Sequence, residues 1–411
     1  MDLRAVTDRI SRWELKLYEL TGSEPETFEE AIGRFDEIDE DQRSARGDLD
    51  LVVLLGESGQ LERAAALIEA LDAADAPAAG FARWLDAAYL EAPTSEEGAA
   101  MVEEIRRTLP RDWFTDTLAR RIATRVDDPE LQADAEASIE ARGRSLLGRV
   151  RALTAAAFGA LLAALALLWR LPRTPGGARL ADAPLPPRWS IATGLGLFLR
   201  GVFGYLLVPA VVVGLAPHAP ASTGLMGLLG GLPMLWWLRR YLHARGETLR
   251  ETFGLRPPGG RALPLLGWSV VLLGLSLAGE SLLSMGFSAV GVTSHWADGF
   301  LEEFLWGSPV TVAASMVDGV VWAPIFEELA FRGLLYPTLR LRLPAVPAAV
   351  LSAAIFGLAH GYGLTGFAAV TCSGAIWALG YERTRSLLPG ILAHAASNAL
   401  ATSSFLLLLR F

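Results

Sequence analysis

Residues 318–332 read Asp-Gly-Val-Val-Trp-Ala-Pro-Ile-Phe-Glu-Glu-Leu-Ala-Phe-Arg, which places two adjacent carboxylates and a guanidinium at the end of an apolar run. Charged groups at membrane depth cost about 2.5 to 3.5 kcal/mol each on insertion scales, so they usually face inward, pair and serve a function. On a helix, Glu328 and Arg332 stand four residues apart and share a face. Glu327 points roughly 100° away from Glu328 and is left for a group on a neighbouring helix.

The composition indicates two regions in different solvents. The chain has 411 residues, of which 52% are hydrophobic, so it is too long and too apolar for one soluble domain. Residues 1–150 hold 34 of the 45 acidic and 18 of the 36 basic residues, a net charge of −16 that leaves +7 for the remainder. The first residues lack the apolar core of a signal peptide. We therefore expect residues 1–145 to be cytoplasmic, and their acidity gives no reason to expect nucleic acid as a partner.

Residues 28–139 show helical periodicity and suggest antiparallel helical hairpins. A small tetratricopeptide-like module that binds a cytoplasmic protein is one interpretation, although no clean repeat of about 34 residues is present. A helical cap without such a role is the other. The breaks between helices are expected at five residues, namely Gly56, Gly59, Pro77, Pro93 and Pro110.

The remainder predicts an all-α, polytopic membrane helix bundle. Its domains are expected at 1–145 (acidic, soluble and helical), 146–189 (a first apolar segment and a Pro-rich linker) and 190–411 (membrane-embedded). Seven or eight spans follow, because arginines flank both ends of the first segment, which could therefore be re-entrant or lie on the surface. The eight apolar segments are 150–169, 190–216, 222–238, 264–287, 309–327, 344–361, 364–382 and 388–409.

The short loops predict the orientation of the bundle. Arginines concentrate in loops 239–261, 332–342 and 383–385, which we expect inside, while the loops that carry His218 and Asp298 hold none and are expected outside. The only cysteine, Cys372, lies in an apolar run and behaves as a small hydrophobe.

Two of the five histidines lie in apolar segments rather than in loops. His360 follows Phe356 by one helical turn, and His394 precedes Asn398 by one turn. Together with Glu327 they supply a carboxylate, two imidazoles and an amide, which antiparallel helices can bring to one depth. The other three histidines are His218, His243 and His295.

This set of groups suits hydrolysis of an amide bond. Burial raises the pKa of a glutamate toward the range that suits a general base. His360 could help to orient or deprotonate the attacking water, and His394 and Asn398 could stabilise the oxyanion. The same Glu327, His360 and His394 could instead hold zinc, but neither histidine has an obvious carboxylate one turn away to orient it. We therefore favour water activation without an obligatory metal.

Glu280 and Asp318 are further intramembrane acids, which could line the cavity or pair with Arg200. The tryptophans, including Trp377, are expected at interfaces or in packing.

Three motifs resemble the CPBP intramembrane protease family, also called Abi or CAAX-protease-like, which includes the eukaryotic Ras-converting enzyme. Glu327 to Arg332 is similar to its EExxxR motif, Phe356 to His360 to FxxxH, and His394 to Asn398 to HxxxN. The resemblance implies an endopeptidase with its catalytic groups in the membrane. It assigns water activation to Glu327 and His360, the oxyanion site to His394 and Asn398, and a supporting role to Glu328 with Arg332. It covers about 318–400 and does not extend to 1–145.

The preferred function is therefore an intramembrane endopeptidase for a membrane-anchored substrate, one class being CAAX-like tails. A non-enzymatic membrane scaffold or transporter is the alternative. We expect an integral protein of a bacterial inner membrane.

Overall fold

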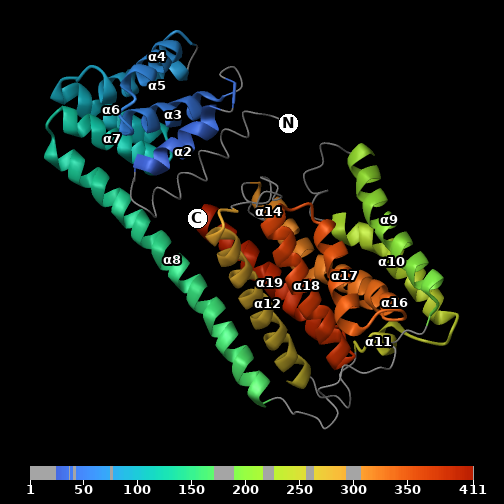
Figure 1. The fold of residues 1–411 in the computed structure, drawn as a ribbon. Coiled ribbons are helices and arrows are strands. Elements are labelled where there is room, and N and C mark those ends of the chain that lie inside the picture. Colours follow the sequence, from blue (N-terminus) through green and yellow to red (C-terminus); the bar gives the residue numbers. More distant parts are fainter. Residues whose placement is uncertain are drawn as a thin grey trace. The chain divides into compact units, whose positions relative to one another are not determined.

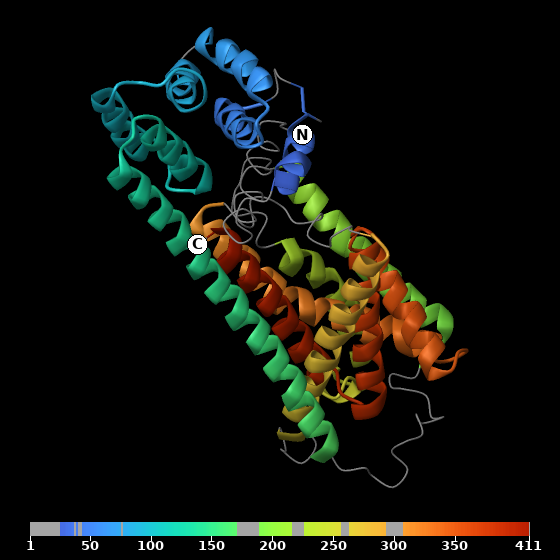
Figure 2. The same ribbon diagram turned by 60° about the vertical axis from the view of Figure 1, so that its left-hand side comes forward.

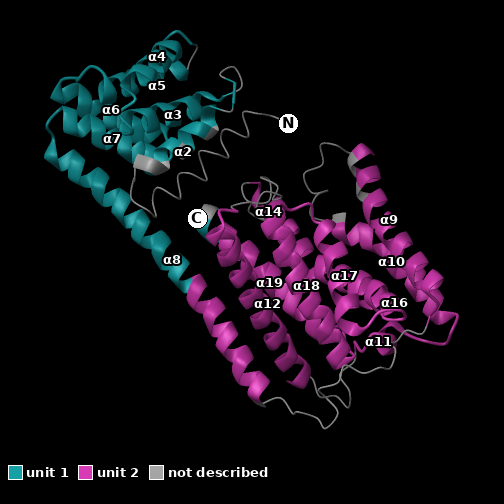
Figure 3. Ribbon diagram, viewed as in Figure 1, with its two compact units in different colours: residues 1–152, 407–409, 411 teal, residues 153–406, 410 magenta. Residues whose placement is uncertain are grey.

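The computed structural model describes residues 25–36, 38–39, 43–74, 77–170, 189–215, 226–255, 263–292 and 307–410. Within these ranges every regular element is a helix, so the predicted all-α fold is confirmed there. The chain divides into two compact units, residues 1–152 with 407–409 and 411, and residues 153–406 with 410 (Figure 3). The predicted external loops with His218, His295, Asp298, Glu302 and Glu303, and the linker 171–188, lie outside the described residues.

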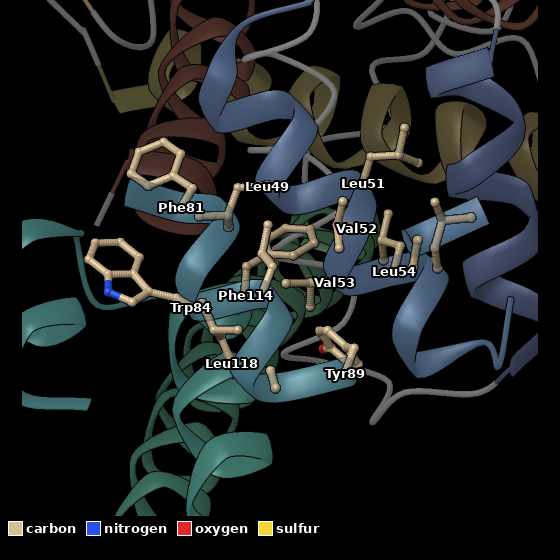
Figure 4. Packing of buried hydrophobic residues seen from close by; sticks show 14 of the residues in the cluster. Leu49, Leu51, Val52, Val53, Leu54, Phe81, Trp84, Tyr89, Phe114 and Leu118 are labelled. Atoms are coloured by element: carbon tan, nitrogen blue, oxygen red, sulfur yellow. The ribbon is translucent and has the colours of Figure 1, made fainter. Parts of the chain in front are cut away.

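In the part of unit 1 that the structure describes, six short helices surround one apolar core (Figure 4). Side chains cap several of them: Ser44 accepts from the amide of Gly47, and Thr94 and Glu97 form a capping box. Leu49, Leu85 and Phe114 are fully buried in the core. The helices are α2 (Pro25–Asp36), α3 (Ala45–Glu57), α4 (Leu61–Asp72), α5 (Ala78–Tyr89), α6 (Ser95–Thr108) and α7 (Trp113–Arg125).

Four of the five predicted breaks fall between these helices, and one does not. Gly59, Pro93 and Pro110 lie in connections, and Pro77 immediately precedes α5. Gly56 lies inside α3 instead of in a connection. The ring of Tyr89 occupies the space in which a Cβ atom of residue 56 would stand, so a glycine is needed there. This glycine serves close packing of α3 and α5 rather than a turn.

The helix α8 (Pro129–Arg170) is 42 residues long and contains the predicted first apolar segment in its second half. The predicted boundary at residue 145 lies within this helix. A change from charged to apolar composition is present there, but no proline follows Pro129 until after the helix ends, so nothing interrupts its backbone hydrogen bonds. The division between the two units also falls within α8, at residues 152 and 153 (Figure 3).

Among the described residues, six helices are long and apolar enough to cross a bilayer, which indicates an integral membrane protein. Two of the eight predicted segments do not meet these requirements of length and composition for a membrane span. The helix α17 (Ala345–Leu358) has 14 residues, about 21 Å of rise against a hydrocarbon core of about 30 Å. The 18-residue α10 (Met226–His243) ends in charged residues. The total of seven or eight spans therefore stays a prediction. The six are Pro129–Trp169, Ile191–Val212, Leu263–Ala289, Pro309–Leu339, Leu364–Thr384 and Leu388–Leu408.

The remaining helices of unit 2 pack around the segment that carries Glu327. Helix α12 contacts both α18 and α19, and the three run side by side in both views (Figures 1 and 2). Helix α17 packs against α18, and α9 packs against α10. These elements are α9 (Ile191–Leu215), α11 (Leu249–Thr252), α12 (Leu263–Ala289), α18 (Leu364–Thr384), α19 (Leu388–Phe405) and η7 (Leu406–Arg410).

The span Pro309–Leu339 alternates between α-helical and wider π-helical turns. It consists of α14 (Pro309–Val317), η5 (Asp318–Trp322), α15 (Ala323–Glu327), η6 (Glu328–Leu335) and α16 (Tyr336–Leu339). Single π-helical turns within α-helices are frequent at functional sites. Glu327 and Glu328 lie at the junction of α15 and η6, and this span contacts α9, α10, α17 and α19.

Candidate active site

Glu328 and Arg332 form a fully buried ion pair on η6. Nη1 of Arg332 donates to Oε1 of Glu328 at 2.9 Å, and each side chain is only 1% exposed. The guanidinium also lies over two aromatic rings, 4.3 Å from the centroid of Phe356 and 5.2 Å from that of Trp377. A buried charge without a partner is costly, so these contacts hold the pair in one geometry.

Two glycines allow the neighbouring helices to reach this pair. A Cβ atom on Gly374 of α18 would stand 2.6 Å from Nη2 of Arg332, and one on Gly390 of α19 would stand 2.9 Å from Oε2 of Glu328. Both distances are shorter than van der Waals contact allows. The close approach of α18 and α19 to the ion pair therefore depends on the absence of side chains at these two positions.

His394 of α19 lies between the two glutamates. Its Nδ1 atom is 3.2 Å from Oε1 of Glu328, and its Nε2 atom is 3.6 Å from Oε2 of Glu327. Because Glu328 is paired with Arg332 and accepts hydrogen bonds, Nδ1 is the donor in this contact. The ring of Trp377 stacks on the imidazole with centroids 4.3 Å apart. Glu328 and Trp377 thus set the plane and orientation of His394.

Glu327 differs from Glu328 in its access to other molecules. Its side chain is 21% exposed, whereas that of Glu328 is 1% exposed. The expectation that Glu327 faces a group on a neighbouring helix agrees with its position beside Nε2 of His394. Glu327 is therefore the carboxylate of the pair that can meet water or a substrate.

His360 lies in the turn after α17 with a defined tautomer. Its Nδ1 atom is 2.8 Å from the carbonyl oxygen of Phe356. A carbonyl can only accept, so Nδ1 carries the proton and the neutral ring has its lone pair at Nε2. Burial lowers the pKa of His360, which favours this neutral form. The Phe356 ring contacts both imidazoles, with centroids 4.6 Å from His360 and 5.9 Å from His394.

Asn398 connects α19 with η5. Its Nδ2 atom donates to the carbonyl oxygen of Gly319 at 2.8 Å. An amide group has two N–H donors, so this bond fixes the side chain and leaves a second donor on the same nitrogen. Asn398 thereby links the helix that carries His394 to the span that carries Glu327.

The structure thus brings Glu327, Glu328, Arg332 and His394 into direct contact, while His360 joins them through the ring of Phe356. Trp377 is in packing, one of its two expected positions, but sequence reasoning missed that it stacks on His394. It also missed Tyr362. This side chain lies 5.2 Å from His360 between ring centroids, and burial together with the Glu327 charge raises its pKa to about 12. Tyr362 is therefore a neutral hydroxyl donor near Glu327.

The two other intramembrane acids have partners of their own. Glu280 accepts from the hydroxyl of Ser373 at 2.5 Å. Asp318 accepts from the amides of Gly227 and Leu228, both at 3.2 Å, and so caps the start of α10. The pairing with Arg200 that the sequence allows is not the arrangement observed, because the guanidinium of Arg200 lies over the ring of Trp237.

The donor set does not fit a zinc site with three protein ligands. In the described ranges no three His, Cys, Asp or Glu side chains are grouped so that they could hold a metal ion. The Nδ1 atom of His394 is held by Glu328 and that of His360 by a carbonyl oxygen, which leaves Nε2 of each ring available and is the orientation that metal-ligating histidines also have. The expectation that neither histidine has an orienting partner is therefore wrong, and only the separation of the candidate ligands speaks against zinc.

Comparison with known proteins supports the resemblance stated above. Residues 309–400, from α14 to α19, match the Rce1-like family model, described as type II CAAX prenyl endopeptidase Rce1-like. The match contains all six candidate residues and does not include unit 1. No curated protein and no solved structure matches the chain. The segment that carries the site, residues 309–400, is therefore similar to the Rce1-like type II CAAX prenyl endopeptidases, in agreement with the CPBP resemblance of its three motifs.

Proposed function

We propose that this protein is an intramembrane endopeptidase that hydrolyses a peptide bond of a membrane-anchored substrate, with a CAAX-like tail as one class. The observation that carries the proposal is that two adjacent carboxylates differ in exposure and in partners. Glu328 is buried against Arg332 and His394, whereas Glu327 keeps 21% of its side chain exposed beside the same histidine. A family-level match to endopeptidases supports the same reaction class.

In the proposed reaction, water attacks the carbonyl carbon of the scissile bond. Glu327 accepts a proton from this water, and the lone pair at Nε2 of His360 orients it or shares the proton. The carbonyl oxygen becomes an oxyanion, and the C–N bond then breaks as the leaving nitrogen takes the proton back. Removal of one donor to such an oxyanion typically costs about 2.7 to 4 kcal/mol in transition-state stabilisation.

His394 and the second N–H of Asn398 are the proposed oxyanion donors. Since Nδ1 of His394 donates to Glu328, a donor at Nε2 requires the doubly protonated ring. The Glu328 and Glu327 carboxylates lie 3.2 and 3.6 Å from Nδ1 and Nε2 of this ring. Tyr362 is a further proposed donor, because burial and the Glu327 charge raise the pKa of its hydroxyl and keep it neutral. We propose this mechanism without an obligatory metal; zinc remains the alternative cofactor.

The test is a proteomic comparison of membranes from cells that carry the wild type, Glu327→Gln or Glu280→Gln. The second variant is a matched control, because Glu280 is also an intramembrane acid but bonds to Ser373 instead of His394. We expect uncleaved precursors to accumulate only with Glu327→Gln. If no cleavage product changes under several growth conditions, or if both variants change the same products, the non-enzymatic scaffold or transporter is favoured.

We further propose that unit 1 lies in the cytoplasm of a bacterial cell and binds a protein partner there. Arg142, Arg144, Arg149 and Arg151 precede the apolar part of α8, as expected of a cytoplasmic flank. Cysteines substituted at Glu91 and Arg250, both exposed, should resist an impermeant thiol reagent in intact cells. Labelling at Glu91 alone would place unit 1 outside.

A further inference from the structure

The outer face of α10 changes from apolar to aromatic to basic along its length. Met234, Leu238 and Leu242 are buried on the inner face of this helix, which packs against α9. On the outer face, Leu232 is 48% and Trp236 56% exposed. The side chains that follow at helical spacing on this face, Arg239, Arg240 and His243, are exposed.

A cavity of about 460 Å³ opens at the basic end of this face. Its lining consists of Trp236, Arg239, Arg240, His243 and Ala244. The Arg240 guanidinium stands 6.0 Å from the centroid of the Trp236 ring, so the indole forms one wall beside the charge. All three titratable groups that line the cavity are basic or imidazole side chains.

The acidic groups near this cavity are engaged elsewhere. The Oε1 atom of Glu247 lies 3.9 Å from Nε of Arg245, and its Oε2 atom accepts a hydrogen bond from the hydroxyl of Thr252. Glu251 accepts a hydrogen bond from the hydroxyl of Thr248 at 2.8 Å. Within the part of the chain that the structure describes, no ion pair involves Arg239, Arg240 or His243. The positive charge of the cavity is therefore available to an anion.

We propose that this cavity binds the phosphate headgroup of an anionic phospholipid. Arg239 and Arg240 are placed to contact the phosphate, Trp236 to lie at the level of the glycerol backbone, and Leu232 to face the acyl chain. The order of these side chains along α10 matches the change from hydrocarbon to headgroup across a bilayer interface. Packing of α10 on the candidate span α9 places this face beside lipid. A soluble phosphate would use the arginines but not the exposed Leu232 and Trp236.

The test measures lipid binding and is independent of peptidase activity. The purified full chain, in detergent, is titrated with phosphatidylglycerol or phosphatidylcholine, and bound lipid is counted by native mass spectrometry. Arg239→Gln with Arg240→Gln should weaken phosphatidylglycerol binding about 30-fold, since each arginine contributes about 1 kcal/mol. Arg250→Gln with Arg342→Gln removes two exposed arginines outside the cavity and should leave binding unchanged. Arg239→Lys with Arg240→Lys retains the charge and should restore most of it.

Three results would overturn the proposal. The first is an equal loss of binding in the cavity and control variants, which would indicate nonspecific attraction to the total charge. The second is equal affinity for phosphatidylglycerol and phosphatidylcholine. The third is binding of inorganic phosphate alone with the affinity of the lipid, which would make the site a soluble phosphate site. Melting temperatures of all variants separate these outcomes from misfolding.

Discussion

Trp377 lies flat against His394, with ring centroids 4.3 Å apart and an angle of 23° between the planes. The contact holds the imidazole so that one nitrogen faces Glu328 and the other faces Glu327. Trp377 is thus a positioning residue, since it acts through His394.

Trp377→Leu should lower kcat about 10- to 100-fold with a smaller change in KM, because a displaced catalytic group loses transition-state stabilisation. Trp377→Phe keeps a flat ring and should retain most of the activity. The measurement is steady-state kinetics on a substrate found by the proteomic comparison. Equal losses in both variants, in step with their melting temperatures, would indicate a packing role only.

Glu328→Gln should lower the stability of the protein. It leaves the buried Arg332 without its charged partner, a loss of about 3 to 5 kcal/mol in comparable buried pairs. Glu247→Gln is the control, because the Glu247 and Arg245 pair is partly exposed and 3.9 Å apart; such pairs contribute about 0 to 1 kcal/mol. Thermal melts of the purified variants decide the matter. An unchanged melting temperature for Glu328→Gln would show that the pair is solvated.

Gly374→Ala should destabilise the protein, whereas Gly286→Ala should not. The added methyl at residue 374 would stand 2.6 Å from Nη2 of Arg332, while at residue 286 no atom lies within 4 Å. Overpacking costs about 1 to 3 kcal/mol, and alanine at an open helical site is neutral or stabilising by about 0.4 to 1 kcal/mol. If both variants melt alike, α18 can move away from the ion pair without cost.

The pH dependence of activity should reflect the buried state of His360. Its pKa lies below the usual value of 6.5 because burial disfavours the charged ring. Activity that needs the neutral ring is therefore present at and above pH 6.5 and is lost as the pH falls through the lowered pKa. The profile of kcat/KM from about pH 5 to pH 8 measures this. An acid limb centred above pH 6.5, or one that persists unchanged in His360→Asn, would assign the titration to another group.

Activity should survive exhaustive chelation. The proposed mechanism takes its base from Glu327 and its oxyanion donors from His394 and Asn398, without a metal step. Elemental analysis of the active protein, with assays before and after chelation, provides the measurement. Stoichiometric zinc whose removal and return switch activity off and on would favour Glu327, His360 and His394 as ligands in a rearranged site.

The sequence predicted the helical class and the pairing of Glu328 with Arg332 because both follow from local spacing. Glu328 and Arg332 are four residues apart, and the span periodicity is strong. The contact of His394 with both glutamates was not predictable, since it depends on how α19 approaches η6. That approach depends on Gly390, which looks unremarkable in a small-residue membrane helix. Packing was one of the two expected positions of Trp377, but its stacking on His394 depends on how α18 and α19 approach each other, which no local spacing predicts.

Two further expectations for this span were wrong. The apolar segment was predicted to end at residue 327 and a loop to occupy 332–342, whereas the helix continues to Leu339. The turns around Glu327 were also assumed to be α-helical. The expected 100° between Glu327 and Glu328 is an α-helical value, whereas η5 and η6 are wider. No residue type signals such turns reliably. They are stabilised by tertiary contacts, such as the bond from Asn398 to the carbonyl of Gly319.

The wide turns of η5 and η6 set the directions in which side chains point around the helix axis, and an ordinary α-helix of the same length would set different ones. Asp318 must face the amides of Gly227 and Leu228 while Glu328, ten residues later, faces Arg332 and His394. Each residue of an α-helix turns the chain by about 100°, so deleting a single residue between the two acids would rotate one of them away from its partners. The span therefore tolerates substitution more readily than a change in length, and length polymorphism among homologues should be confined to segments outside it.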